Sequence, residues 1–389
     1  MGELPASPVE QTLGRLIAWD TVSHRPLTAM AGWLADRAED AGMKVERFES
    51  APGKVNVVAS AGPPGSDGLG LSGHMDVVPV EGQAWSTDPF RLSIQGDRLL
   101  GRGTCDMKGF IAASVEAIAR LDLRSLRREL VLVWTHDEEV GCQGSAQLVS
   151  DLAAAGRRLP EAMVVGEPTS FRIAHLHPGH ATLRIRCTGR PAHSSRPALG
   201  LSAIKIAGRV LAVLNELEVA LEAVRGHEGV LDTPHTVMNV GRIRGGEAIN
   251  IVPERCALDV GFRPLPGVAF ADIRAELMDR LAPVIATVRL HGGDIAVDDV
   301  QCSEGLHTSA SCGHVDLLRP HAVGDALVGV PFATDAGNLS ALGCRSLVFG
   351  PGSIDVAHRP DEFLERKDLA RTVDIVQDLI RRRCISTAA

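Results

Sequence analysis

The hydrophobic period of this chain changes near residue 181 and changes back near residue 292, and no other sequence feature constrains the fold as strongly. Before residue 181, short apolar runs alternate with segments of helical period, which predicts a largely parallel sheet covered by helices. The expected strands are Val55–Ala59, Leu69–Ser72, Arg98–Leu100, Leu130–Trp134 and Ala162–Val165. The expected helices are Pro8–Trp19, Leu27–Gly42, Met107–Arg120 and Gly144–Ala155.

The middle block has the pattern of strands with one wet face, because apolar and polar residues alternate there. This alternation predicts strands at 182–187, 237–243 and 255–262, with helices at 201–224 and 270–281. After residue 292 we expect a buried strand at Ser346–Phe349 and a last helix at Arg366–Arg383.

These patterns predict an α/β protein with an insertion. Residues 1–180 and 292–389 are expected to form one domain, a mixed, largely parallel sheet flanked by helices. Residues 181–291 are expected to form an inserted two-layer α+β domain. A chain of 389 residues is longer than one hydrophobic core usually spans, which agrees with two domains.

Charge and hydropathy limit the partners of the chain. The net charge is −8 and no run is rich in Lys or Arg, so nothing predicts binding to nucleic acid or to an anionic membrane surface. No segment approaches the roughly 20 apolar residues of a membrane span. We therefore expect a small-molecule partner, with no nucleic acid and no membrane involved.

The cysteines and the first residues predict a cytoplasmic location. The eight cysteines are scattered from Cys105 to Cys384 without a Cys-x-x-Cys motif, which is typical of reduced thiols. Residues 1–11 lack the basic and apolar segments of an export signal. Cys105 and Cys142 are interpreted as small packing residues, not as metal ligands.

An apolar run, Leu130–Trp134, leads within a few residues into three consecutive acids, Asp137, Glu138 and Glu139. Adjacent like charges repel each other. Either water screens these carboxylates, or a positive charge is held between them.

The chemically active residues, including these acids, share one placement, just after an expected strand. They are His74 with Asp76, Asp106, Glu138 with Glu139, Glu167 and His358. The carboxyl ends of strands in an open parallel sheet form one rim, where ligands bind. We therefore expect these side chains to converge.

The converging side chains form a ligand set of two imidazoles and three or four carboxylates, which suits zinc, cobalt or manganese. A pair of metals roughly 3.5 to 4 Å apart needs a bridging carboxylate and about two further ligands each, and this set supplies them. Asp76 can hold the ring nitrogen of His74 that faces away from a metal. Of Glu138 and Glu139, one can bind metal while the other accepts a proton from a metal-activated water.

Each residue alone also has a structural explanation. Asp106 could cap the helix that follows it, and Glu138 and Glu139 could be acids in the first turn of a helix. A single histidine such as His74 or His358 is more often a hydrogen-bonded loop residue than a ligand. Glu167 could be an ordinary turn residue before Pro168. These explanations do not account for the joint occurrence after strands.

The motifs resemble those of the M20-type metallopeptidase and deacylase family, which contains acetylornithine deacetylase, succinyl-diaminopimelate desuccinylase and glutamate-releasing carboxypeptidases. The matching segments, in the family's order and spacing, are Ser72–Pro79, Gly101–Gly109, Asp137–Gly141, Gly166–Thr169 and Ala357–Phe363. Within the family, the segments Trp85–Phe90, Gly101–Ile111 and Phe349–Ser353 read most like acetylornithine deacetylase.

The resemblance implies a zinc-exopeptidase-like catalytic domain with a specific ligand set. Asp106 would bridge two zinc ions, with His74 and Glu167 completing one site. Glu139 and His358 would complete the other site, and Glu138 would be the general base. Cobalt is the alternative metal.

The resemblance also implies that the inserted domain is a lid that forms a homodimer. His193, in the segment Gly189–Ser194, matches a histidine that stabilises the oxyanion of the substrate, often across the dimer. Asn250 and Arg263 match lid positions that contact substrate, and an arginine fork suits an α-carboxylate. Without the resemblance, His193 would be interpreted as a surface histidine and Arg263 as a surface charge at a strand end.

The implied activity is hydrolysis of an N-acyl amino acid, with N2-acetyl-L-ornithine giving L-ornithine and acetate in arginine biosynthesis. Alternative substrates are succinyl-diaminopimelate, acetylcitrulline or a dipeptide, and a different alternative is a non-catalytic, metal-dependent binding protein. One residue departs from the ornithine enzymes, which commonly have Gly-Thr-Glu-Ala-Gly where this chain has Ala333–Gly337 with Asp335. The shorter acid could shift which side chain is accepted.

Overall fold

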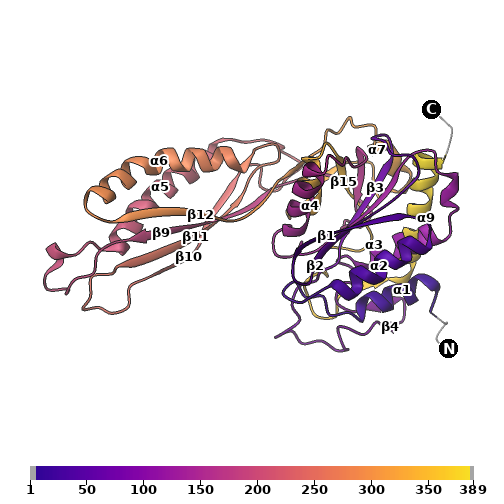
Figure 1. Ribbon diagram of the computed structural model, residues 1–389, viewed down its shortest axis with the longest axis horizontal. Coiled ribbons are helices and arrows are strands. Elements are labelled where there is room, and N and C mark those ends of the chain that lie inside the picture. The colour runs from indigo at the N-terminus through magenta and orange to yellow at the C-terminus, as the bar shows by residue number, and fades with distance from the viewer. Residues whose placement is uncertain (1–5, 386–389) are drawn as a thin grey trace. The chain divides into compact units, whose positions relative to one another are not determined.

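The computed structural model describes residues 6–385 and divides the chain into two compact units (Figure 1). The first unit takes in the chain up to Leu176, Leu306–Gly329 and the chain from Thr334 onward. The second unit consists of His177–Gly305 with Val330–Ala333. Of the segment 1–11, where no export signal is expected, residues 1–5 lie outside the described part.

A mixed sheet forms the centre of the first unit, with the strand order β1-β2-β6-β3-β7-β15-β8-β13 and with β14 paired to β8. Its strands are β1 (Lys44–Ala51), β2 (Lys54–Ala61), β3 (Leu69–His74), β6 (Leu130–Thr135), β7 (Ala162–Val165), β8 (Ala174–His177), β13 (Leu306–His307), β14 (Val328–Gly329) and β15 (Arg345–Val348). The neighbours β6, β3, β7 and β15 run parallel, while β1, β2 and β6 pair antiparallel. The predicted mixed, largely parallel sheet is confirmed.

The parallel strands at the centre are buried on both faces, which explains why they read as continuous apolar runs. Every residue of β3, β6 and β7 is buried. In the register of these strands Leu69 lies opposite both Leu130 and Ala162. The strands therefore start level with one another, and their carboxyl ends open onto the same rim of the sheet.

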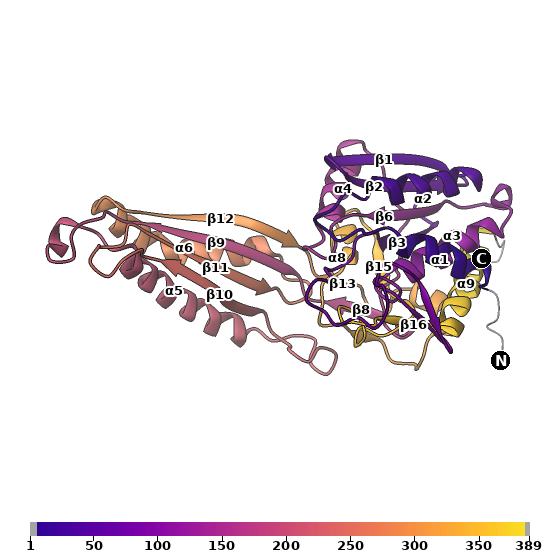
Figure 2. The ribbon, with the colours of Figure 1, turned by 90° about the horizontal axis from the view of Figure 1, so that it is seen from below.

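Helices cover this sheet (Figures 1 and 2). They are α1 (Pro8–Ile17), α2 (Thr28–Asp40), α3 (Lys108–Ala119), α4 (Gln143–Ala154), the short α7 (Val315–Leu318), α8 (Asp335–Ser340) and α9 (Arg366–Ile380). Helix α3 packs against both α1 and α9, and α4 packs against α8. In residues 6–385, no helix has the length and the apolar character that crossing a membrane requires.

One expected strand belongs to a different sheet from the one predicted. Arg98–Leu100 forms β5, but β5 lies in a separate three-stranded antiparallel sheet with β4 (Ser93–Gln95) and β16 (Phe363–Glu365). The expectation that Asp106 follows a strand of the parallel sheet is therefore wrong. A three-residue strand carries too little pattern to show which sheet it joins.

The second unit has two layers, an antiparallel sheet and two long helices. The sheet order is β10-β11-β9-β12, with β9 (His180–Thr188), β10 (Val237–Gly245), β11 (Arg255–Arg263) and β12 (Asp294–Ser303). Helices α5 (Ala203–Ala223) and α6 (Phe270–Leu290) share a buried core with one face of this sheet. The other face carries ion pairs such as Arg184–Asp259. The predicted two-layer α+β insertion is confirmed.

The insertion extends beyond the boundary expected at residue 291. Strand β12 pairs with β9 in the register Ile295 to Cys187, so the second unit continues to Gly305. This strand contains three aspartates and lies at the edge of the sheet. Its sequence therefore does not show a clear alternation of apolar and polar residues. Helix α6 also continues to Leu290, through Pro283, past the expected end at residue 281.

The alternation along β9 predicts unequal effects of two neighbouring substitutions. Leu183 is fully buried between sheet and helices, so Leu183→Ala should lower the free energy of unfolding of this unit by about 2–5 kcal/mol. Arg184 makes only a surface ion pair, so Arg184→Ala should cost less than about 1 kcal/mol. Urea unfolding followed by circular dichroism measures both changes. Equal losses would contradict the assigned faces of the strand.

Candidate metal centre

The rim of the parallel sheet carries most of the expected site residues. His74 is the last residue of β3, Glu138 and Glu139 follow β6, and Glu167 follows β7. Because these strands are parallel and in register, their ends place the side chains together.

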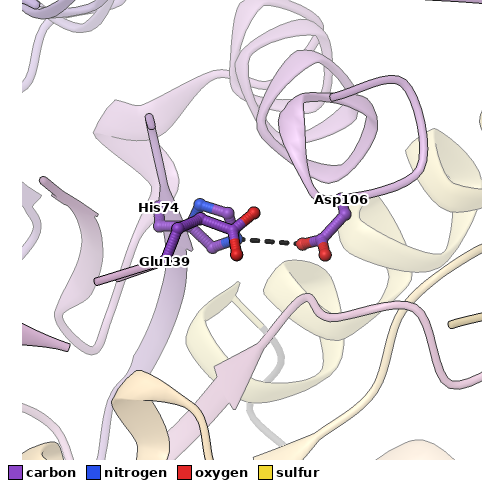
Figure 3. Close-up of side chains that lie close together, drawn as sticks. All are labelled: His74, Asp106 and Glu139. Atoms are coloured by element: carbon purple, nitrogen blue, oxygen red, sulfur yellow. Dashed lines mark hydrogen bonds and ion pairs between the residues drawn. The ribbon is translucent and has the colours of Figure 1, made fainter. Parts of the chain in front are cut away.

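Asp106 lies between the two histidines of the site. Its Oδ1 is 3.0 Å from Nε2 of His74, and its Oδ2 is 3.2 Å from Nε2 of His358. A further acid approaches the same ring nitrogen of each histidine: Glu167 Oε1 is 3.8 Å from His74 Nε2, and Glu139 Oε2 is 3.0 Å from His358 Nε2. Figure 3 shows His74, Asp106 and Glu139 close together, with the contact between His74 and Asp106.

This arrangement has the symmetry that a shared ligand requires. Each oxygen of Asp106 serves a different imidazole, and each imidazole has its own second carboxylate. Ligand atoms of His74, Asp106 and Glu139 all lie within 4.8 Å of one another. The five predicted ligands therefore converge in the first unit.

The purely local explanations for the acids do not fit the structure. Helix α3 begins at Lys108 with Met107 as its N-cap, and no side chain caps it, so Asp106 is not an N-cap. Helix α4 begins at Gln143 and has no acid in its first turn. Glu138 and Glu139 therefore do not complement a helix dipole from within that turn.

The three consecutive acids separate because their backbone turns sharply. Asp137 adopts a left-handed conformation with a φ of 52°. Its carboxylate points away from the centre, with Oδ1 2.6 Å from Nζ of Lys54 and Oδ2 3.1 Å from Nδ1 of His136. Asp137 is thus neutralised by Lys54, and of the three acids only Glu138 and Glu139 remain available to the candidate site.

Asp76 fixes this turn through its carboxylate. The carboxylate accepts hydrogen bonds from the backbone N–H of Glu138 at 3.0 Å and of Glu139 at 3.2 Å, and from Oγ of Ser23 at 2.7 Å. Nδ1 of His74 lies 3.0 Å from the backbone carbonyl oxygen of Asp76 and 3.6 Å from its carboxylate. The main chain of Asp76 therefore orients the imidazole, while its side chain orients the two glutamates.

Burial makes the centre electrostatically unfavourable for so many acids. Burial raises the pKa of Glu139 to about 7, and the charge of Asp106 acts in the same direction. Burial also raises the pKa values of Glu138 and Glu167 well above that of an ordinary glutamate, and neighbouring acids add to the effect. Although burial acts to raise it, hydrogen bonds from His358 and His74 lower the pKa of Asp106.

The same acids favour positive charge on the imidazoles. Hydrogen bonds to Asp106 and Glu139 raise the pKa of His358 to about 10. A cluster that raises carboxyl and imidazole pKa values together has an excess of negative charge, which divalent cations would balance. Carboxylate oxygens and imidazole nitrogens are ligands of zinc and related metals. The residues present therefore fit a pair of divalent ions that share Asp106.

The other expected site residues lie in the second unit. His193 pairs with Ile251 in an isolated bridge, and the N–H of Ser194 donates to the carbonyl oxygen of Asn250 at 3.0 Å. His193 and Asn250 are therefore neighbours. Arg263 is the last residue of β11, at the opposite end of that strand from Arg255, which lies near the Asn250 loop. A nine-residue strand spans about 26 Å, so Arg263 is far from His193.

Asp335 is buried, with 1% of its surface exposed. It opens helix α8, and its Oδ2 accepts a hydrogen bond of 2.5 Å from Oγ1 of Thr135, the last residue of β6. Its charge raises the pKa values of Glu138 and Glu167. Asp335 thus contacts the strand that leads to the glutamates and does not face open solvent.

Two supporting residues were not identified from the sequence. Lys54 gives no signal, because a lysine at the start of a strand is common on protein surfaces. Glu362 lies within the Ala357–Phe363 motif, yet only the structure shows that its carboxylate contacts the loop carrying Asp106.

Comparison with known proteins gives concordant matches. The model of peptidase family M20/M25/M40 matches residues 70–382. The chain is 34% identical over 375 residues to acetylornithine deacetylase of Edwardsiella ictaluri, covering 94% of this chain and 93% of the relative. It is 34% identical over 361 residues to acetylornithine deacetylase of Salmonella arizonae, covering 92% and 90% of the two chains.

Solved structures share the fold at lower identity. A metallo-carboxypeptidase of the M20 family from Sulfolobus solfataricus superimposes with a TM-score of 0.73 at 18% identity, covering 96% of this chain and 99% of that one. A tripeptidase from Staphylococcus aureus has a TM-score of 0.72 at 19% identity, covering 98% and 99%. A dinuclear metal-binding peptidase from Bacillus subtilis has a TM-score of 0.64 at 13% identity, covering 96% and 97%.

The position of Asp106 predicts that it serves both ions, whereas Asp137 serves neither. Asp106→Asn should lower the metal content from about two ions per chain to below about one. Asp137→Asn should retain both ions, because this acid pairs with Lys54. Elemental analysis after dialysis against buffered zinc measures both variants. Loss of metal from the Asp137 variant alone would contradict the assignment.

Proposed function

This chain belongs to peptidase family M20/M25/M40, and from this membership we propose that it is a metal-dependent hydrolase of N-acyl amino acids. The proposed substrate is N2-acetyl-L-ornithine, which yields L-ornithine and acetate, a step of arginine biosynthesis. The identity of 34% to acetylornithine deacetylases over more than nine tenths of the chain supports the substrate class. The placement of Asp106 between His74 and His358 is the observation that carries the proposal.

The residues of the rim would hold two zinc ions, with cobalt as the alternative. His74 and Glu167 would hold one ion, and Glu139 and His358 would hold the other ion. Asp106 would contact both ions. Such ions, when bound, polarise the carbonyl of a substrate and lower the pKa of water.

Glu138 is proposed as the general base. Its backbone N–H is fixed by Asp76, and its side chain is not tied to an imidazole as Glu139 is to His358. Burial and the neighbouring acids raise the pKa of Glu138, which makes its carboxylate a stronger proton acceptor than an ordinary glutamate. Glu138 takes a proton from the attacking water and delivers it to the leaving nitrogen as the C–N bond breaks.

Three residues of the second unit are assigned to substrate binding. Arg263 would pair with the α-carboxylate, Asn250 would contact substrate, and His193 would stabilise the oxyanion. Because Arg263 lies at the end of β11 remote from the loop with His193, and this strand alone spans about 26 Å, one small substrate does not reach both within a single chain. This separation supports a homodimer in which His193 acts in the site of the partner subunit.

Exposed apolar residues support the same assembly. Ile249 is fully exposed, and Ile204 and Ile251 are each nearly half exposed. Ile251 pairs with His193 in an isolated bridge, and Ile249 lies two residues before it. Exposed apolar side chains of this kind are favourable at an interface between copies of the chain. We place the enzyme in the cytoplasm, in accord with its eight free cysteines.

Replacing Glu138 tests whether this residue is needed for turnover but not for metal binding. Glu138→Gln should keep both metal ions and lower kcat by about 10²–10⁴-fold, because a neutral amide cannot accept the proton. Glu49→Gln, an exposed strand residue, is the matched control and should keep full activity. Elemental analysis and steady-state kinetics are the measurements. A Glu138 variant with near-normal kcat would exclude it as the base.

Asp335 favours testing a second substrate class, because the ornithine enzymes of the family commonly have glutamate there. The test compares kcat/KM of the zinc-loaded protein for N2-acetyl-L-ornithine, N-acetylcitrulline, succinyl-diaminopimelate and a dipeptide. We expect the highest value for acetylornithine. A higher value for another amide would reassign the substrate, and inactivity toward every amide would favour a metal-dependent binding protein.

A further inference from the structure

The small antiparallel sheet connects the two loops that supply Asp106 and His358. Strand β5 leads into the loop with Asp106, and β16 follows the loop with His358. The two strands pair in the register Phe363 to Leu100, and the N–H of Gly101 donates to the carbonyl oxygen of Glu362 at 3.0 Å. This pairing places the side chain of Glu362 against the loop that carries Asp106.

The carboxylate of Glu362 accepts four hydrogen bonds from that loop. Its Oε2 accepts from Nη1 of Arg102 at 2.7 Å and from the N–H of Gly103 at 3.1 Å. Its Oε1 accepts from the N–H of Cys105 at 2.8 Å and of Asp106 at 3.0 Å. One carboxylate therefore fixes three backbone amides, including that of the shared acid itself.

These contacts are fully shielded from water. The side chain of Arg102 is 1% exposed and that of Glu362 is 0% exposed. A buried carboxylate that lost its partners would be strongly destabilising, so the loop is held in the conformation that satisfies it. The turn itself depends on Gly103, whose φ of 86° is unfavourable for other residues.

Arg102 extends the network to the loop of His358. Its Nη2 donates to Oε1 of Gln83 at 2.6 Å, and Nε2 of Gln83 donates to the carbonyl oxygen of His358 at 2.9 Å. His358 has a φ of 62°, so its backbone conformation needs such external support. The guanidinium also lies over the ring of Trp85, 5.0 Å from its centroid.

We propose that Glu362 is a positioning residue that sets Asp106 between His74 and His358, and that Arg102 and Gln83 extend its action to His358. This inference rests on the proposed function, because it assumes that Asp106 is the shared ligand of two metal ions. Glu362 touches neither substrate nor metal in this assignment. It acts by fixing the backbone of the loop that bears the ligand.

The chemistry of the contacts explains why an acid is needed at this position. A carboxylate has two acceptor oxygens and no hydrogen-bond donor. A glutamine amide has the same shape but one oxygen and one NH₂ group, so in either orientation the NH₂ group would face two donors. The loop would have to move away from that group, and Asp106 would move with it.

The experiment titrates Co²⁺ into metal-free protein and follows its visible absorption, which reports both affinity and ligand geometry. Glu362→Gln should weaken the binding of both ions by about 10–100-fold, because the two sites share Asp106. Gln83→Leu should weaken only one of the two binding steps, since Gln83 contacts His358 alone among the ligands. The absorption band of the Glu362 variant should also differ from that of the wild type.

Glu365→Gln is the matched control. This residue lies three positions further along the chain, at the end of β16, and its carboxylate forms a partly exposed ion pair with Arg98 at 3.3 Å. It should bind Co²⁺ like the wild type. Glu362→Asp is the milder variant for the case in which Glu362→Gln does not fold, and it should lower affinity in the same direction, because the shorter side chain withdraws from the backbone amides.

The outcomes distinguish this inference from the proposed function. If the wild-type protein binds fewer than two ions, the proposed function itself is contradicted. A wild type with two ions, together with a Glu362 variant that matches Glu365→Gln in affinity and spectrum, would overturn the positioning role alone. If neither Glu362 variant folds, the Co²⁺ titration of Gln83→Leu tests the proposal instead. Unchanged binding of both ions by that variant would overturn the proposed role of the hydrogen-bond network.

Discussion

Mutual repulsion of buried carboxylates is the constraint on which the rest of the first unit depends. Asp76, Asp106 and Glu167 are each at most 5% exposed, and Glu138 and Glu139 lie beside them. Such a cluster is unstable without positive charge or hydrogen-bond donors. The fold supplies both: two imidazoles at the centre, and backbone N–H groups around it. The local turns of the loops follow from this requirement.

The acids of the site therefore divide into two groups with different partners. Asp106, Glu139 and Glu167 face imidazole nitrogens, whereas Asp76 and Glu362 face backbone amides. At the rim the strands end, so apolar packing no longer fixes the chain and the freed N–H groups need acceptors. A buried carboxylate accepts several N–H groups at once and so replaces packing as the element that holds a loop. On the proposed function, Asp76 and Glu362 therefore set the positions of the proposed metal ligands without binding metal themselves.

The sequence predicted the features that depend on local pattern. Buried strands such as Leu130–Thr135 read as apolar runs, and parallel pairing alone implied that residues after them would meet. Contacts between distant segments were not predictable. Glu362 is more than 250 residues from the loop that it holds, and neither residue pattern nor period encodes that pairing. The edge strand β12 was not predicted for another reason: its exposed, polar sequence resembles that of a loop.

The placement of Asp335 limits how this residue can influence specificity. It is buried, and its hydrogen bond to Thr135 ties it to the end of β6, directly before the turn with Glu138 and Glu139. A shorter acid at this position therefore changes the strand end and the electrostatics of the glutamates, and it does not reshape an open wall. Direct recognition of the amino-acid side chain then has to come from other residues. On the proposed function these include Arg263, at the end of β11, and Asn250, in the loop that precedes the start of that strand. On the proposed function, the first unit supplies the catalytic groups, and the proposed homodimer would bring the substrate-binding residues of the second unit to them.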